Sequence, residues 1–206
     1  MFELTMKFFS LVDSEHEEEA RALAEAAPQS AERDGLTGYL YYFGIGGKMQ
    51  SIKMAYVMFE RGIRENDSLS LYMLGLMCDR EETPDQTTDG PRKKYDRTDA
   101  PRLMERCVKD EMTMSLAARL WLGEYYLDGD RGANPDLGIK YLEFAAENYS
   151  CEEALTVLVD YYREISGDSS LPTNVRTRSA FNGAKWRQKL DSLAEKMENS
   201  SGELLS

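Results

Sequence analysis

Apolar residues recur along this chain with the spacing of amphipathic helices. Ile52, Ala55, Met58 and Phe59 follow one another at helical intervals in one segment. Near the C-terminus the same interval separates Trp186, Leu190, Leu193 and Met197. No segment shows the convincing period of two that a half-buried strand requires. The pattern therefore predicts an all-helical fold.

A short pattern of small and aromatic residues returns along the chain. It centres on Gly38 in the first copy, on Gly75 in the second and on Gly123 in the third, and a degenerate fourth copy has Val159 instead. Self-similarity at this spacing is typical of arrays of paired helices. We call these four residues the anchors and predict that each marks the first helix of a pair. A glycine at a helix crossing permits a short distance between the two axes.

The second helix of each pair is predicted to end near two small residues. These small pairs are Gly62–Ile63, Cys107–Val108 and Ala145–Ala146. The step from Gly75 to Cys107 is longer than its counterparts, so the extra length lies inside the second pair. Residues 82–98 in that interval contain two prolines and no aliphatic residue. This composition predicts an inserted surface loop.

These signals predict the organisation of the whole chain. We expect capping helices in 1–31, repeats in 32–166 with the loop at 82–98, a loop and a capping helix in 167–197, and a disordered tail in 198–206. The patterns Ser14–Glu17 and Ser150–Glu153 predict capping boxes at helix starts. Further N-caps are expected at Asp67, Asp99 and Asp136.

The repeated pattern resembles the Sel-one-like repeat, a relative of the tetratricopeptide repeat. Its form AxxxLGxxYxxG is matched without a gap by Ala118, Leu122, Gly123, Tyr126 and Gly129. The resemblance implies a right-handed α-solenoid of antiparallel helix pairs whose first helices line a concave face. It also implies a non-enzymatic scaffold or adaptor that binds a protein or peptide. The inserted loop and the fourth anchor, Val159, depart from the family pattern.

The resemblance also implies which residues face the groove. In tetratricopeptide-type helices these lie three positions before the anchor and one and four positions after it. Carried over to this chain, the groove residues are Tyr39, Tyr42, Tyr72, Leu76, Asp79, Leu120, Glu124, Leu127, Asp160 and Arg163. Aromatic residues in the first copies and carboxylates in the later ones suit a partner with apolar anchors and a basic segment. Tyr41 is expected on the opposite, packed face.

Charge and hydropathy limit the classes of partner and the cellular compartment that we predict. The net charge of −12 and the pI near 4.7 argue against nucleic-acid binding, which depends on clustered Lys and Arg. No apolar stretch approaches the ~18 residues of a membrane span, and the start of the chain lacks a signal-peptide pattern. We therefore predict a cytoplasmic protein without membrane insertion. Three cysteines without CxxC spacing fit reduced thiols, and the oligomeric state stays open.

The sequence shows no concentrated catalytic chemistry. His16 is the single histidine and lies in an acidic helix start, so a solvated position is expected instead of a metal or general-base role. The segment Gly44–Lys48 differs from a phosphate loop, because Tyr42 and Met49 stand where that loop needs Gly and Ser or Thr. We predict no cofactor, no metal and no enzymatic activity. The alternatives are a neutralising, immunity-type partner of a toxin or effector, and an enzyme on a helical-repeat fold.

Overall fold

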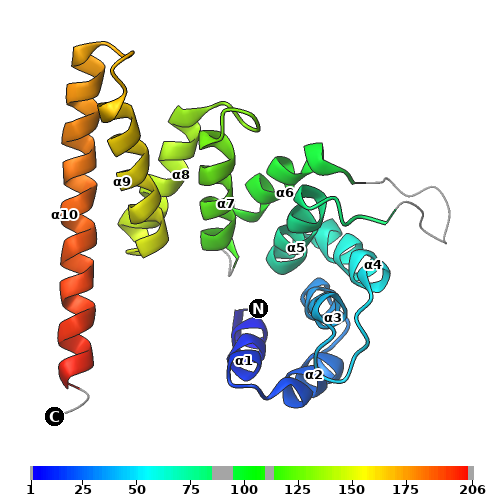
Figure 1. Ribbon diagram of the computed structural model, residues 1–206. Coiled ribbons are helices and arrows are strands. Elements are labelled where there is room, and N and C mark those ends of the chain that lie inside the picture. The colour runs from blue at the N-terminus through cyan, green and yellow to red at the C-terminus, as the bar shows by residue number, and fades with distance from the viewer. Residues whose placement is uncertain (1, 85–94, 110–113, 204–206) are drawn as a thin grey trace. The chain divides into compact units, whose positions relative to one another are not determined.

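The computed structural model describes residues 2–84, 95–109 and 114–203, and these residues are helical or lie in turns, without any strand (Figure 1). The chain divides into two compact units, Met1–Ala118 and Arg119–Ser206, which are described separately below. In chain order the elements are α1 (Phe2–Asp13), α2 (Glu17–Ala26), α3 (Ala31–Phe43), α4 (Ile52–Gly62), η1 (Ile63–Glu65), α5 (Ser68–Asp79), η2 (Arg97–Asp99), α6 (Ala100–Cys107), α7 (Ser115–Leu127), α8 (Pro135–Asn148), α9 (Glu152–Gly167) and α10 (Thr173–Glu203).

The helices pack as successive antiparallel pairs. In the first unit α3 packs on α4, α5 packs on α6, and α5 also contacts both helices of the preceding pair. Helices α1 and α2 pack on each other and on α3. In the second unit α9 packs on α8 and, most extensively, on α10. The prediction of an all-α fold built from antiparallel helix pairs is confirmed.

Each glycine anchor lies at a close crossing with the second helix of its own pair. The facing residues are Phe59 for Gly38, Met104 for Gly75 and Leu142 for Gly123. A Cβ atom on these glycines would lie 2.5, 2.9 and 2.5 Å, respectively, from the nearest atom of that side chain. In every case the facing residue stands three positions before the small pair of the second helix. The shared register shows that the three pairs are structural copies of one another.

The last pair reverses this arrangement. The anchor Val159 is buried in α9, and the glycine lies on the second helix, where a Cβ atom on Gly183 would lie 3.3 Å from Cβ of Tyr162. Tyr162 is itself nearly buried, and Trp186, one turn further along α10, is fully buried. The close approach of two helices is therefore kept, although the glycine has changed sides.

The predicted insertion at 82–98 is closed at its base. The Thr83 hydroxyl donates a hydrogen bond to the Tyr95 carbonyl over 2.8 Å. Burial of Tyr56 in α4 raises the pKa of its hydroxyl to about 12. Residues 85–94 of this segment lie outside the described residues. The two described ends of this segment meet at the Thr83–Tyr95 hydrogen bond, and the Tyr95 backbone also forms a hydrogen bond with the Tyr56 hydroxyl of α4.

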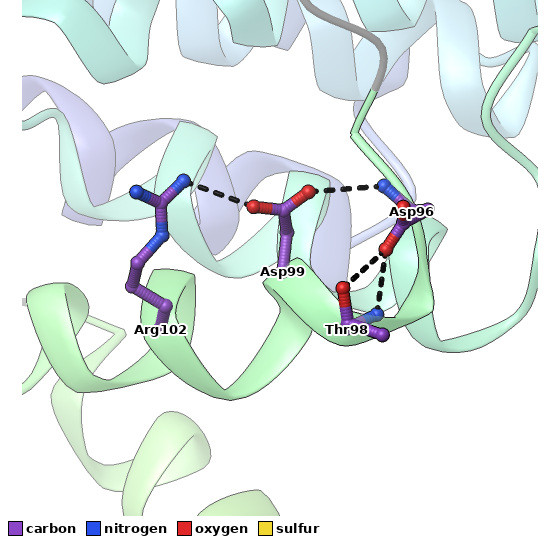
Figure 2. A network of polar contacts seen from close by, with 4 residues as sticks. All are labelled: Asp96, Thr98, Asp99 and Arg102. Carbon is purple, nitrogen blue, oxygen red and sulfur yellow. Dashed lines mark hydrogen bonds and ion pairs between the residues drawn. The ribbon is translucent and has the colours of Figure 1, made fainter.

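The chain re-enters helical structure through a reciprocal cap (Figure 2). Asp96 accepts hydrogen bonds from the backbone N–H and the hydroxyl of Thr98, at 2.9 and 2.6 Å, and the Asp96 N–H donates to Asp99. Arg102 in turn donates to Asp99 over 3.0 Å. The sequence predicted Asp99 as the N-cap, but the carboxylate that accepts the capping hydrogen bonds belongs to Asp96. Asp99 instead completes the capping box that starts η2.

The other predicted caps had mixed outcomes. Asp67 is confirmed, because its carboxylate accepts the Ser70 N–H at 2.8 Å and starts α5. The Ser14 hydroxyl instead donates to carbonyls of the preceding helix, and Ser150 lies outside the helix with a φ of 49°. Asn134, not Asp136, caps α8. A serine hydroxyl can serve the helix before it or the helix after it, so sequence spacing alone did not distinguish these cases.

The C-terminal helix is longer than expected. Helix α10 runs to Glu203, into the segment 198–206 that the sequence predicted to be a disordered tail. Residues 204–206 lie outside the described residues. The extension follows a stretch rich in Ala, Glu, Lys and Leu, which are strong helix formers.

All three cysteines are free thiols. None of the helices in the described ranges combines the length and the apolar character needed to cross a bilayer.

We predict that Gly123→Ala destabilises the protein whereas Gly129→Ala does not. The new methyl group at Gly123 would overlap Leu142, and such overpacking costs roughly 1–3 kcal/mol. Gly129 has no heavy atom within 4 Å of the corresponding position, so its substitution serves as the matched control. Urea unfolding measures both free energies. Equal losses for the two variants would contradict the crossing.

A second prediction concerns the pH dependence at Asp67. Burial raises the pKa of this carboxyl, Glu32 and Asp34 raise it further, and hydrogen bonds from Ser70 oppose the shift. Because the pKa of Asp67 is higher in the folded state than in the unfolded state, the folded state binds the proton more tightly. The stability of the protein therefore decreases as the pH rises from the unfolded pKa to the folded pKa. Asp67→Asn keeps the cap and removes the charge. Its stability relative to the wild type should therefore increase from about pH 4 to about pH 7.

Asp67→Ala is the control for the cap itself. It should be about 1 kcal/mol less stable than Asp67→Asn at either pH, because the Ser70 N–H loses its acceptor, and it should share the pH dependence of Asp67→Asn relative to the wild type. Urea unfolding of the three proteins at both pH values makes the comparison. If neither variant gained stability relative to the wild type between the two pH values, the buried charge would not be unfavourable.

Candidate functional site

The predicted groove residues lie on the first helices α3, α5, α7 and α9. We call the side of each helix that carries these positions its first-helix face. On α3, α5 and α7 the anchor glycine packs against the second helix of the pair. The structure places the ten residues in different environments, described below helix by helix.

The face of α3 is covered by the N-terminal helix. Tyr39 meets Phe8 and Phe9 of α1 edge to face, with ring centroids 5.8 and 5.1 Å apart. The ring centroid of Phe43 lies 4.5 Å from that of Tyr39. This enclosure raises the pKa of the Tyr39 hydroxyl, because burial disfavours the phenolate. Helix α1 thus occupies part of the face that the sequence predicted to be a groove.

Tyr42 belongs to the core. Its side chain is only 6% exposed. Its hydroxyl donates a hydrogen bond to Glu82 over 2.5 Å and accepts one from the Arg80 guanidinium over 3.1 Å. Burial, followed by the hydrogen bond with Glu82, raises the pKa of this hydroxyl. The structure therefore corrects the expectation that Tyr42 is an open anchor for a partner.

The expectation for Tyr41 is corrected in the opposite direction. Tyr41 was assigned to the packed face, but it is less buried than Tyr42, and the Lys48 ammonium lies 5.4 Å from its ring centroid. Tyr41 and Tyr42 are consecutive, so their side chains point about 100° apart around α3, and the rotation of the helix about its axis decides which of them is buried. The crossing of Gly38 with Phe59 sets that rotation.

The face of α5 combines apolar and acidic side chains. Tyr72, Leu76 and Asp79 are separated by four and three positions, so they lie on one side of the helix. All three are half-buried, whereas the residues between them, such as Met73 and Leu74, are buried. In the first unit this stripe is the part of the predicted groove that keeps partial exposure along its whole length.

The faces of α7 and α9 are more exposed. Leu120 and Leu127 are half-buried, and Glu124 between them is exposed. On α9, both Asp160 and Arg163 are exposed, and the guanidinium donates to the carboxylate over 2.6 Å. This pair neutralises itself, so the two charges on α9 present less net field than either residue would alone.

Sequence reasoning missed an aromatic cluster in the second unit. Trp121 and Tyr125 stack with centroids 4.9 Å apart, and the Arg131 guanidinium lies 5.5 and 5.1 Å from the two rings. Tyr126 continues the cluster to Tyr141 of α8, 6.3 Å away. The four-residue spacing of Trp121 and Tyr125 could have indicated the stacking. The guanidinium contact arises from the turn that returns Arg131 to α7.

The described residues contain no group of three or more His, Cys, Asp or Glu side chains that could hold a metal ion. His16 lies in an exposed turn, where its Nδ1 is 2.8 Å from the Ser14 carbonyl oxygen.

The first-helix faces offer apolar contact area, aromatic rings and scattered carboxylates. Such a surface is suited to non-covalent recognition of another chain.

Comparisons with known proteins show a distant likeness to a solved structure. No protein-family model matches the chain, and no curated protein does. Among solved structures, a Sel1 repeat protein from Oxalobacter formigenes is 16% identical, with a TM-score of 0.38. That match covers 92% of this chain and 82% of the other.

We predict that Tyr42→Ala destabilises the protein more than Tyr41→Ala, the reverse of the expectation from sequence. Removing a buried aromatic ring leaves a cavity and typically costs about 3–5 kcal/mol, whereas Tyr41 is only half-buried. Tyr42→Phe should lose about 1 kcal/mol, because only the hydrogen bonds to Glu82 and Arg80 disappear. Thermal and urea unfolding of the three variants tests this order. A larger loss for Tyr41→Ala would place Tyr41, not Tyr42, in the core.

Proposed function

We propose that this protein is a non-enzymatic scaffold or adaptor that binds a protein or peptide through its first-helix faces. The observation that carries the proposal is the repeated register of exposure. On α5 and α7, the side of the anchor is packed against the second helix, while the positions three before the anchor and one and four after it retain exposure. A repeated stripe of this kind supports recognition of an extended or helical segment.

The side chains on these stripes suit such a partner. Tyr72, Leu76, Leu120 and Leu127 supply apolar and aromatic area that is only half-buried within the chain. Aromatic anchors contribute a large share of binding free energy when a partner completes their burial. Asp79 and Glu124 add carboxylates beside them, which favour a basic segment in the partner through charge complementarity.

The covered face of α3 limits the proposed site. Phe8 and Phe9 of α1 already occupy the surroundings of Tyr39, and Tyr42 is in the core. We therefore assign the proposed contacts to α5 in the first unit and to α7 in the second. Asp160 and Arg163 on α9, which bind each other, would have to exchange that ion pair for contacts with the partner.

Site-specific photo-crosslinking tests this proposal. A photoreactive amino acid is placed at Leu76 or Leu127 on the first-helix faces, and at Lys53 or Lys140 on exposed positions of the second helices α4 and α8. We expect the two first-helix positions to capture the same protein from the native host and the two control positions to capture none of it. Equal capture at the control positions would contradict the assignment. A captured toxin would identify the immunity-type alternative.

The same partner then allows a quantitative check. Tyr72→Ala should weaken binding by about 1–2 kcal/mol, in line with truncation of an aromatic anchor. Lys53→Ala, at an exposed position of the second helix α4, is the control. Isothermal titration of each folded variant with the purified partner measures the difference. An unchanged affinity for Tyr72→Ala would exclude the α5 face from the interface.

A further inference from the structure

The first half of α10 differs in charge from the rest of the chain. Residues 169–190 contain no Asp or Glu, although the whole protein has a net charge of −12. The basic residues in this stretch are Arg176, Arg178, Lys185, Arg187 and Lys189. A positive island in an acidic protein creates a local field of opposite sign, which selects partners by charge.

Four residues of this island share one side of α10. Arg178, Phe181, Lys185 and Lys189 follow one another at intervals of three or four positions. The three cations are exposed. Phe181 is 74% exposed, so most of its apolar ring is accessible to a partner. We call this set the α10 basic face. It combines positive charge with one aromatic contact point.

Two of its cations are held close together by a buried ring. The ammonium groups of Lys185 and Lys189 lie 4.3 and 4.7 Å from the centroid of Trp186, which is fully buried. Both ammonium groups also approach one carboxylate oxygen of Glu147, at 3.8 and 3.5 Å. The cations therefore converge on one point before any partner arrives, which reduces the entropy lost on binding.

The ion pairs with Glu147 leave this point available for exchange. Their distances exceed the 2.7–2.9 Å that is typical of a charge-assisted hydrogen bond, and all three side chains are close to half-exposed. Exposed pairs of this kind contribute little free energy. A hollow of about 330 Å³ adjoins them, and its lining includes Lys189, Gln188, Ser192 and Glu147. An incoming carboxylate has both space and donors there.

We propose that the α10 basic face docks an acidic protein segment that also carries an apolar side chain. A carboxylate of the segment binds Lys185 and Lys189 in place of Glu147, and the apolar side chain packs on Phe181. From Arg178 to Lys189 the face is about 17 Å long at 1.5 Å per residue. An extended chain of about five residues spans that length. This surface lies on a second helix, so the proposal does not depend on the first-helix faces.

The surrounding charge favours a short acidic segment over a phosphate polymer. Asp168 ends α9 just before the island, and Asp191 and Glu195 follow it on α10. Binding to a duplex or to an anionic membrane uses positive charge spread along an extended surface. Acidic residues at both ends of the island repel such surfaces but leave room for a few carboxylates between them.

Fluorescence anisotropy with the full chain tests the proposal. The probe is a fluorescein-labelled peptide in which pairs of Glu alternate with single Leu residues, and its counterpart has Lys in place of Glu. We expect the Glu peptide to bind more tightly, with an affinity that weakens as salt is added. Equal binding of the two peptides would overturn the proposal.

A gain of affinity provides the sharpest test. Glu147→Gln removes the internal carboxylate that competes for the two lysines, and it should tighten binding of the Glu peptide about fivefold. Glu153→Gln, at an exposed position of α9, changes the net charge equally and should alter the affinity less than about twofold. If the two variants behaved alike, the lysine pair would not be the binding point.

Loss-of-affinity variants complete the design. The double variant Lys185→Gln/Lys189→Gln should bind about tenfold more weakly, whereas Lys53→Gln/Lys140→Gln should bind nearly as the wild type does. Phe181→Ala should also weaken binding about tenfold, in contrast to Met49→Ala, which truncates another strongly exposed apolar side chain, in the first unit. Circular dichroism confirms that each variant is folded. Equal losses in the control variants would overturn the proposal.

Two further probes distinguish the chemical class of the partner. Vesicles that contain phosphatidylserine and a labelled single-stranded oligonucleotide are titrated in parallel with the Glu peptide. We expect both to bind more weakly than the peptide. Tighter binding to either, abolished by Lys185→Gln/Lys189→Gln, would replace the acidic segment by a lipid surface or a nucleic acid and overturn the assignment.

Discussion

The close crossing of two helices at a glycine is the contact on which the rest of each pair depends. Phe59, Met104 and Leu142 enter the space that a side chain on the facing glycine would occupy. A large residue against a missing side chain permits a short interaxial distance and also sets the rotation of both helices about their own axes. Once that rotation is set, the buried and the exposed positions of the first helix follow from its period.

This rotation explains why the first-helix faces differ in exposure. On α3 it directs Tyr42 into the core and Tyr39 toward α1, where Phe8 and Phe9 cover it. On α5 and α7 the corresponding positions stay half-buried or exposed. The same repeated geometry thus gives a closed face at the start of the chain and more open faces later. The proposed partner site follows from that difference.

The two proposed surfaces differ in the sign of their charge as well as in the helices that carry them. The first-helix faces carry Asp79 and Glu124 beside apolar residues, which suits a basic segment. The α10 basic face carries converging lysines beside Phe181, which suits an acidic one. Surfaces of opposite charge on one chain discriminate between partners, because each repels the segment that the other attracts. Under these proposals the protein binds two unlike segments at once, as an adaptor would.

The sequence by itself determined what depends on neighbours within a few turns. Helical periodicity gave the all-α fold, the spacing of Gly38, Gly75 and Gly123 gave the helix pairs, and Asp67 was recognised as a cap from the residues that follow it. Composition predicted the insertion, and Thr83 and Tyr95 near its ends are joined by a hydrogen bond. These signals are local, so they survive in any tertiary arrangement.

Only the tertiary structure decided which of two adjacent residues is buried. Tyr41 and Tyr42 differ by one position, and their environments are chosen by the rotation of α3 and by Arg80 and Glu82, about 40 positions along the chain. The convergence of Lys185 and Lys189 likewise depends on Glu147 of another helix and on the burial of Trp186. Such contacts join residues that are distant in sequence, and their geometry depends on how whole helices pack, which periodicity does not encode.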